Sequence, residues 1–242
     1  MNATVATARR VLQQLSHDHR SVAIIVVLPS ILLVVFRYVY NDNDQIFDRV
    51  GPQMLGIFPF IVMFLVTSVT MVRERTSGTL ERLLTTPLKR GELIGGYAIA
   101  FALAALVQSL VSSAVAIWGL DLGVKSAWVV VLFAVVDALL GTALGLFFSA
   151  FARTEFQAVQ FMPAVVIPQL LLCGLLAPRD QMAEALQWAA YAMPLTWATE
   201  AFTEALTTTG LNDIMWRNLA ILVAFVVVSI AGASLTLRRK TP

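Results

Sequence analysis

The chain of 242 residues is 58% hydrophobic and only 13% charged, and its mean hydropathy is +0.79. A soluble domain carries a charged fraction of about 25%, so the composition excludes an ordinary soluble protein and indicates a membrane protein whose apolar surface faces lipid. The net charge of +2 argues against nucleic-acid binding. Cys173 is the only cysteine, which excludes an internal disulfide and cysteine-rich metal sites.

Six segments contain the roughly 20 mostly apolar residues that are needed to cross about 30 Å of hydrocarbon. Lipid offers no partner to an unpaired backbone group, so each segment is predicted to be an α-helix. We therefore expect an all-α membrane protein with a single transmembrane domain over residues 1–242. The six predicted spans are residues 22–40, 52–72, 93–118, 128–151, 157–176 and 218–237.

The basic residues predict how these spans are oriented. If both termini are cytoplasmic, most of the 17 lysines and arginines fall on the cytoplasmic side. This asymmetry follows the positive-inside rule. The sequence therefore predicts a multi-pass protein of the cell membrane with cytoplasmic termini. The exceptions, on the outer side, are Arg37, Arg49, Lys125, Arg179 and Arg217.

The N-terminal segment, residues 1–21, is predicted to be an interfacial helix. Apolar residues such as Val5, Ala8 and Leu12 recur at helical spacing, while Arg9 belongs to another face. Two histidines follow at positions 17 and 19, but no third ligand is nearby, so no metal site is predicted.

Residues 177–213, before the last span, include an apolar stretch at 186–206 that resembles a seventh span. Pro194 interrupts this stretch, and Glu200 and Glu204 would carry charge into lipid. We expect two short helices that enter the outer leaflet and return. An amphipathic pair that lies on the surface is the alternative.

The segment 73–92, RERTSGTLERLLTTPLKRGE, is densely charged and lies between two apolar spans. Gly78 can act as an N-cap, with Glu81 three residues later to support exposed backbone donors. The proline at 87 stops the element, which gives a helix of about eight residues. Its apolar residues fall at i, i+3, i+4 and i+7 and make one stripe: Leu80, Leu83, Leu84 and Pro87.

A helix this short is marginal in water, so its leucines must dock against something. They could fold back on the ends of the chain's own spans. They could also enter a groove on a cytoplasmic partner, with Glu81 and Arg82 fixing the orientation at the rim. The residue pattern alone favours neither alternative.

Residues 73–97 resemble the signature of the membrane subunits of type-2 ABC exporters, E-R-x-x-G-T-L-E-x-L-L-x-T-P. The stretch MPLTWATEAF, residues 193–202, is also similar to a family pattern, with Met193 in place of a frequent Asn and Trp197 in place of a frequent Tyr. The resemblance extends over nearly the whole chain and is strongest to the antibiotic-efflux branch, represented by daunorubicin-resistance permeases.

The resemblance implies that SGTLERLL is a coupling helix, seated in a cleft of a separate ATP-binding subunit. It implies two membrane subunits around a central pathway, with ATP and Mg²⁺ bound by the partner ATPases and no catalytic residue or cofactor on this chain. No G-x-x-x-x-G-K-[ST] motif occurs in the sequence, in agreement with a separate ATPase. The implied coupling residues are Glu74, Arg75, Gly78, Thr79, Leu80, Glu81, Arg82, Leu83, Leu84 and Pro87. The implied extracytoplasmic gate region contains Pro194, Leu195, Thr196, Trp197 and Glu200.

Candidate pathway residues lie within the spans. Asp137 is an acid deep in the fourth span, where insertion costs roughly 2.5–3.5 kcal/mol, so it should face the bundle or a wet cavity. It could contact a cationic substrate, serve a proton-linked step or be structural. Pro163 and Pro168 can kink the fifth span, although ordinary hydrogen bonds between helices explain its glutamines equally well. The candidates are Gln108, Asp137, Gln160, Pro163, Pro168 and Gln169.

The sequence thus predicts the transmembrane subunit of an ATP-driven exporter of amphipathic or hydrophobic compounds, with drugs or antibiotics as the expected cargo. Export of lipid or polysaccharide is the alternative within the same class. A proton- or ion-coupled carrier centred on Asp137 is the alternative of another class, although no inverted repeat supports it. An intramembrane hydrolase is disfavoured because no H-E-x-x-H motif occurs. The expected partners are an ATPase subunit, a second permease and membrane lipid, without nucleic acid.

Overall fold

The computed structural model describes residues 3–40, 43–79 and 90–236. Within these ranges the regular structure is helical and no strand occurs. The elements are α1 (Ala3–His17), α2 (His19–Val39), α3 (Asp44–Thr76), α5 (Arg90–Ala114), the π-helical turn η1 (Val115–Gly119), α6 (Ala127–Ser149), α7 (Glu155–Leu172), the 3₁₀ turn η2 (Arg179–Gln181), α8 (Glu184–Tyr191), α9 (Pro194–Ala205) and α10 (Asp213–Thr236).

Six of the described helices are long and apolar enough to cross a membrane, which confirms the predicted number of spans. They are α2, α3, α5 with its continuation η1, α6, α7 and α10. The second span differs from the prediction because α3 begins at Asp44 and continues through Pro52 and Pro59. Hydropathy detects only the apolar stretch that crosses the hydrocarbon, whereas the helix extends beyond this stretch. The two prolines do not end α3, because membrane helices tolerate proline.

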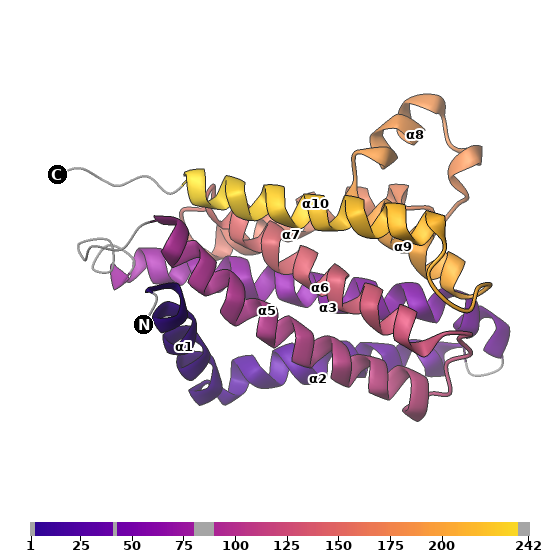
Figure 1. Cartoon of the computed structure of the whole chain (residues 1–242), viewed down its shortest axis with the longest axis horizontal. Coiled ribbons are helices and arrows are strands. Elements are labelled where there is room, and N and C mark those ends of the chain that lie inside the picture. The colour runs from indigo at the N-terminus through magenta and orange to yellow at the C-terminus, as the bar shows by residue number, and fades with distance from the viewer. Residues whose placement is uncertain (1–2, 41–42, 80–89, 237–242) are drawn as a thin grey trace.

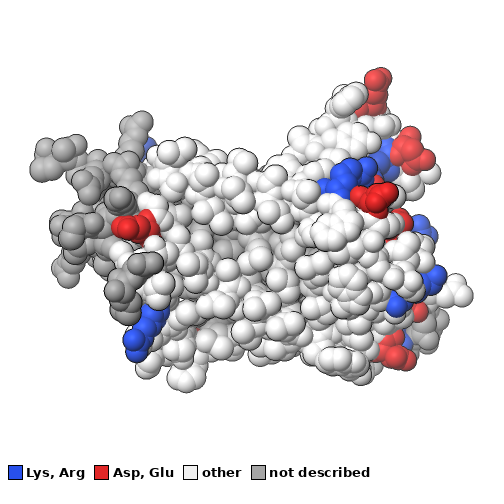
Figure 2. All heavy atoms as spheres, viewed as in Figure 1, with Lys and Arg blue, Asp and Glu red and all other residues white. Residues whose placement is uncertain are grey.

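The long helices lie lengthwise beside one another (Figure 1). The start of α1, the end of α3, the start of α5 and the end of α10 share one end of the bundle, which we call the proximal end. The opposite, distal end holds α8, α9 and the start of α10. On the face shown in Figure 2, acidic and basic side chains lie at the two ends and the belt between them is free of both. An uncharged belt is what the hydrocarbon core of a bilayer requires.

The centre of the bundle is the contact between α3 and α6, and α5 and α10 also pack against α6. A Cβ atom added at Gly141 would lie 2.3 Å from the carbonyl oxygen of Phe60, and one at Gly145 would lie 2.6 Å from that of Phe64. The two glycines therefore allow the backbones of α3 and α6 to touch, as G-x-x-x-G motifs do between membrane helices. The partner of this motif is thus another span of the same chain.

Helix α1 packs across α5, and Gly96 makes the approach possible because a Cβ atom there would lie 2.5 Å from that of Thr7. The chain then turns at Asp18, whose carboxylate accepts hydrogen bonds from the backbone N–H of Ser21 (3.2 Å) and from its hydroxyl (2.6 Å). This is the N-cap of α2, so the expected break between the first helix and the first span lies at this residue.

Before the last span, the expected interruption at Pro194 is present, since this residue is the first of α9. Proline suits that position because its backbone nitrogen would have no partner within the helix. Helix α8 projects away from the bundle at the distal end, whereas α9 packs against α3, α6 and α10 (Figure 1). Whether the pair enters the outer leaflet stays a prediction.

Candidate functional site

At the proximal end, three consecutive charged residues of α3 contact three different parts of the molecule. Arg73 forms a bidentate pair with Glu155, the first residue of α7: Nε lies 2.9 Å from Oε1 and Nη2 lies 3.0 Å from Oε2. Both side chains are exposed, at 61% for Arg73 and 42% for Glu155. Water therefore screens this pair, which orients the two helix ends more than it stabilises them.

Arg75 binds the end of α6. Its Nη1 atom lies 3.1 Å from the carbonyl oxygen of Ser149, 3.3 Å from that of Ala150 and 3.5 Å from that of Ala152. The last carbonyls of a helix have no partner within it and carry partial negative charge. The guanidinium of Arg75 thus supplies the donor that the end of α6 lacks.

Glu74 connects α3 with α1 and α5. Its carboxylate lies 3.5 Å from Nη2 of Arg10 on α1, and the same nitrogen donates a hydrogen bond to the hydroxyl of Tyr97 on α5. The Arg10 guanidinium also lies over the Tyr97 ring, 5.7 Å from its centre. Tyr97 is completely buried, so this contact belongs to the interior of the bundle.

These contacts define the proximal cluster: Arg10, Arg73, Glu74, Arg75, Tyr97 and Glu155. Successive residues of a helix project about 100° apart, so three adjacent side chains reach partners on different sides. The end of α3 is consequently held by α1, α5, α6 and α7. Gly78 follows with a φ of 73°, the left-handed conformation that commonly terminates a helix and that glycine adopts without strain. A force applied just beyond Gly78 would reach four helices at once.

Of the predicted coupling residues, the structure describes four. Glu74 and Arg75 belong to the proximal cluster, Gly78 ends α3, and the hydroxyl of Thr79 lies 3.0 Å from that of Ser77. The others lie outside the described residues, so the coupling helix stays a prediction: Leu80, Glu81, Arg82, Leu83, Leu84 and Pro87.

The predicted pathway residues occupy different environments. Asp137 and Gln108 are both 0% exposed, and within the described part of the chain their side-chain polar atoms have no hydrogen-bond partner. Asp137 lies where α3, α6 and α9 meet, because a Cβ atom at Gly56 would be 2.8 Å from Oδ2 of Asp137 and 2.3 Å from the ring of Phe202. By contrast, Gln160 is exposed on α7.

Two of the other candidates on α7, Pro168 and Gln169, line a cavity of about 430 Å³. Pro163 is exposed and is not among its lining residues. The cavity wall comes from α6, α7, α10 and the turn between α8 and α9, and none of its lining residues is charged. The prediction of α7 as a pathway wall is therefore consistent with the geometry for its distal half but remains a prediction.

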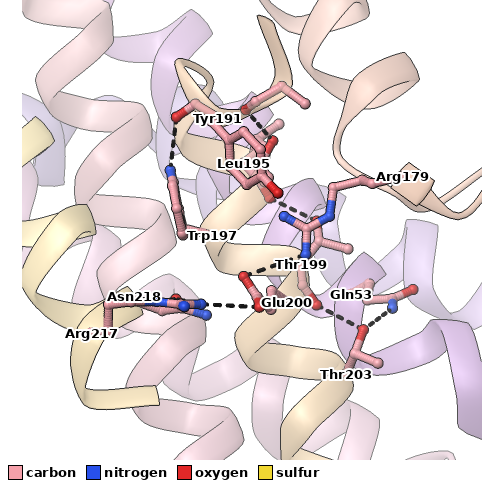
Figure 3. A network of polar contacts seen from close by, with 12 residues as sticks. Gln53, Arg179, Tyr191, Leu195, Trp197, Thr199, Glu200, Thr203, Arg217 and Asn218 are labelled. Atoms are coloured by element: carbon pink, nitrogen blue, oxygen red, sulfur yellow. Dashed lines mark hydrogen bonds and ion pairs between the residues drawn. The ribbon is translucent and has the colours of Figure 1, made fainter. Parts of the chain in front are cut away.

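At the distal end, Glu200 on α9 lies between two arginines (Figure 3). Its Oε1 accepts a hydrogen bond from Nη2 of Arg217 on α10 at 3.0 Å, and its Oε2 forms an ion pair with Nη2 of Arg179 in η2 at 3.4 Å. Each guanidinium also lies over an aromatic ring, Arg179 over Tyr191 at 5.8 Å and Arg217 over Trp197 at 5.3 Å. We call these five residues the distal network.

Hydrogen bonds at the start of α9 fix its position. The backbone N–H of Leu195 donates to Oε1 of Gln169 on α7 at 3.4 Å, and Thr196 and Trp197 donate from their side chains to the carbonyls of Ala190 (2.7 Å) and Tyr191 (3.1 Å). The predicted gate residues thus lie together, with Pro194 buried at the helix start. The sequence did not reveal Arg179 or Arg217 as their partners, because these come from other elements.

The fold and these sites define a multi-span membrane protein with a charged connection at one end. The chain matches the family described as "ABC-2 type transporter" over residues 2–207, and it belongs to this family. Membership of this family indicates a transport subunit in the membrane.

Three relatives illustrate the similarity. "ABC transporter G family member 20" of Dictyostelium discoideum is 28% identical over 83% of this chain and 28% of its own length. "Probable multidrug ABC transporter permease YbhR" of Escherichia coli K12 is 27% identical over 86% of this chain and 56% of its own length. "Linearmycin resistance permease protein LnrN" of Bacillus subtilis 168 is 27% identical over 70% of this chain and 44% of its own length. The chain therefore spans about half or less of these relatives.

Proposed function

We propose that this chain is the transmembrane subunit of an ATP-driven exporter of amphipathic or hydrophobic compounds, with drug or antibiotic efflux as its role. The printed names of two relatives, a multidrug permease and a linearmycin resistance permease, support this class of cargo.

The observation that carries the proposal is the proximal cluster. ATP and Mg²⁺ bind to a separate ATPase subunit, which contacts the segment after Gly78, and a second permease copy or a homologous permease completes the complex. Because Glu74 and Arg75 join the end of α3 to α1, α5 and α6, movement of that segment reaches the bundle through short polar contacts. The cytoplasm faces the proximal end, as the positive-inside rule predicts.

Export of lipid or polysaccharide uses the same architecture and is the alternative within this class. The printed names of the multidrug permease and the linearmycin resistance permease favour drugs or antibiotics as the cargo over lipid or polysaccharide. The substrate class can be measured directly, as the stimulation of ATP turnover by a panel of drugs, lipids and oligosaccharides in a reconstituted complex.

The test of coupling uses the segment's predicted apolar stripe. Leu83→Asp or Leu84→Asp should reduce ATP-dependent transport at least tenfold in vesicles that contain the ATPase, while membrane insertion stays intact. Thr85→Asp is the matched control, because it adds the same charge in the same segment but off the stripe. Normal export by the two leucine variants with the ATPase present would overturn the proposed coupling.

A further inference from the structure

We propose that the cavity between α6, α7 and α10, together with the arginines of the distal network, binds one glycerophospholipid of the surrounding bilayer. An acyl chain occupies the cavity and the phosphate lies at Arg217. This site is separate from the coupling of transport to ATP, and its occupant is a bound lipid rather than the exported compound.

The cavity suits a hydrocarbon chain. Its lining is mainly apolar and carries no charge, with Phe147 from α6, Pro168 from α7, Met193 from the α8–α9 turn and Val228 from α10. Val228 is 69% exposed, so the cavity continues into the lipid-facing surface of α10. Within the hydrocarbon layer neither water nor a polar group fills such a space favourably, whereas an acyl chain does.

Phe147 and Gly232 limit the cavity on its proximal side. A Cβ atom at Gly232 would lie 2.8 Å from the ring of Phe147, so the glycine lets this ring rest on the backbone of α10. The residues on the other side, Met193 and Pro194, belong to the turn beneath the distal network. A lipid whose acyl chain enters the cavity therefore has its polar headgroup directed toward the distal end of the bundle.

The distal network supplies the charge that a phosphate requires. Two guanidiniums, Arg179 and Arg217, contact the carboxylate of Glu200, so these three side chains together carry one excess positive charge. The Arg217 side chain is 50% exposed, and its bonds to Glu200 and Asn218 use only Nε and Nη2. Nη1 therefore remains for a phosphate oxygen, to which arginine donors bind strongly. The nearby acids at 180 and 213 are exposed, where solvent screens them, and Glu204, one turn after Glu200 on α9, accepts a hydrogen bond from Asn212 at 2.7 Å.

The two halves of the site have the right spacing. Arg217 and Val228 are eleven residues apart on α10, which is within about 20° of three full turns, so they share one face of the helix. Glu200 lies six residues beyond Pro194 on α9, a rise of about 9 Å. The first cavity residue on α10 is Phe225, eight residues after Arg217, a rise of about 12 Å. A phosphate at Arg217 thus lies roughly 9–12 Å from the cavity, a gap that a glycerol backbone and its ester groups can bridge.

The aromatic residues of the distal network also support a lipid headgroup at the depth of Arg179 and Arg217. Tyr191 and Trp197 lie under the two guanidiniums, with ring centres 5.7 Å apart. Trp and Tyr are enriched at membrane–water interfaces, where their rings meet the apolar layer and their polar atoms meet the headgroups. The network is therefore placed where a phosphate of the leaflet lies.

The proposal is tested by native mass spectrometry of the full chain in detergent with added dioleoylphosphatidylglycerol. The protein should retain one lipid, and Val228→Trp, which fills the cavity, should reduce retention about tenfold. Val227→Trp is the matched control, because Val227 is a neighbouring valine on α10, 59% exposed, that does not line the cavity. Equal retention by the two tryptophan variants would overturn the proposal.

A second pair of variants tests the phosphate. Arg217→Gln should weaken phosphatidylglycerol binding about tenfold and leave dioleoylglycerol binding unchanged, while Lys125→Gln, which removes another distal cation, should change neither. If dioleoylglycerol binds the unaltered protein as tightly as the phospholipid, the arginines do not contribute to lipid binding and the proposed phosphate site is wrong. If Val228→Trp instead breaks a dimer and leaves lipid retention unchanged, the occupant is a second copy of the chain and the lipid proposal is wrong.

Discussion

The guanidinium of Arg75 lies 3.1 Å from the carbonyl oxygen of Ser149, so a single side chain joins the last turn of α3 to the last turn of α6. The same two helices already touch through Gly141 and Gly145. Helix α6 is the most buried span of the described chain. Arg75 therefore connects the segment beyond α3 to the most enclosed element of the structure.

Replacement of Arg75 by glutamine should destabilise the protein more than replacement of Arg73. Arg75 donates to carbonyls in a partly buried position, and hydrogen bonds that involve a charged group contribute about 1.5–3 kcal/mol. Arg73 forms an exposed pair, for which about 0.2–1 kcal/mol is typical. The midpoint of thermal unfolding in detergent should fall clearly for Arg75→Gln and little for Arg73→Gln. Equal shifts for the two neighbouring arginines would contradict the assigned roles.

Glu74 and Arg10 should affect transport through their contact with each other, so the losses from the two substitutions should not add. Glu74→Ala and Arg10→Ala should each lower ATP-dependent transport about fivefold, and the double variant should lose no more than Arg10→Ala alone, because Arg10→Ala already removes the contact with Glu74. Transport and ATP turnover are measured in the same vesicles, so that loss of coupling is distinguished from loss of the ATPase. Independent, multiplicative losses would show that the two residues act separately.

The sequence was sufficient for the number of spans and for the location of the charged segment. Both follow from local properties, since about 20 apolar residues must cross the hydrocarbon and charge must leave it. The break at Pro194 was also predictable, because proline lacks the backbone donor that a continuous helix needs. The start of α3 at Asp44 was not, because the residues before Pro52 are too polar for a hydropathy criterion.

The partners of individual charges could not be predicted from the sequence. Arg73, Glu74 and Arg75 are adjacent, yet their partners are more than 60 residues away and on different helices. Tertiary packing alone decides which of the available acids, carbonyls and hydroxyls each side chain meets. The same holds for Gly141, because only tertiary packing decides that this glycine lies against the backbone of α3 at Phe60.

The contact between α3 and α6 should tolerate no side chain at Gly141. In Gly141→Ala the new methyl group would lie 2.3 Å from the carbonyl oxygen of Phe60, a backbone atom that cannot rotate away. Separation of the helices should cost about 1–3 kcal/mol or more. Gly91→Ala on α5 is the matched control, because nothing lies within 4 Å of its added Cβ atom and alanine favours a helix by about 0.5–1 kcal/mol. The midpoint temperature of thermal unfolding should therefore fall for Gly141→Ala and stay unchanged or rise for Gly91→Ala.

Asp137→Asn separates the proposed exporter from a carrier that uses this acid. The side chain of Asp137 is fully enclosed between α3, α6 and α9 and bonds to no described residue, so a neutral side chain of the same shape should fit. ATP-dependent transport should therefore stay within about twofold of the unaltered protein, a difference of about 0.4 kcal/mol. Asp137→Leu, which changes the shape beside Gly56 and Phe202, is the control for packing and should lower stability.

The same variant is then assayed in vesicles without the ATPase. The exporter predicts no concentrative transport there, with or without a proton or ion gradient, for either the unaltered protein or Asp137→Asn. A carrier predicts gradient-driven uptake by the unaltered protein that Asp137→Asn abolishes, because a neutral amide cannot take up and release a proton or balance a cation. That second outcome would assign the energy source to this chain itself and would remove the reason for a force-transmitting contact at Glu74 and Arg75.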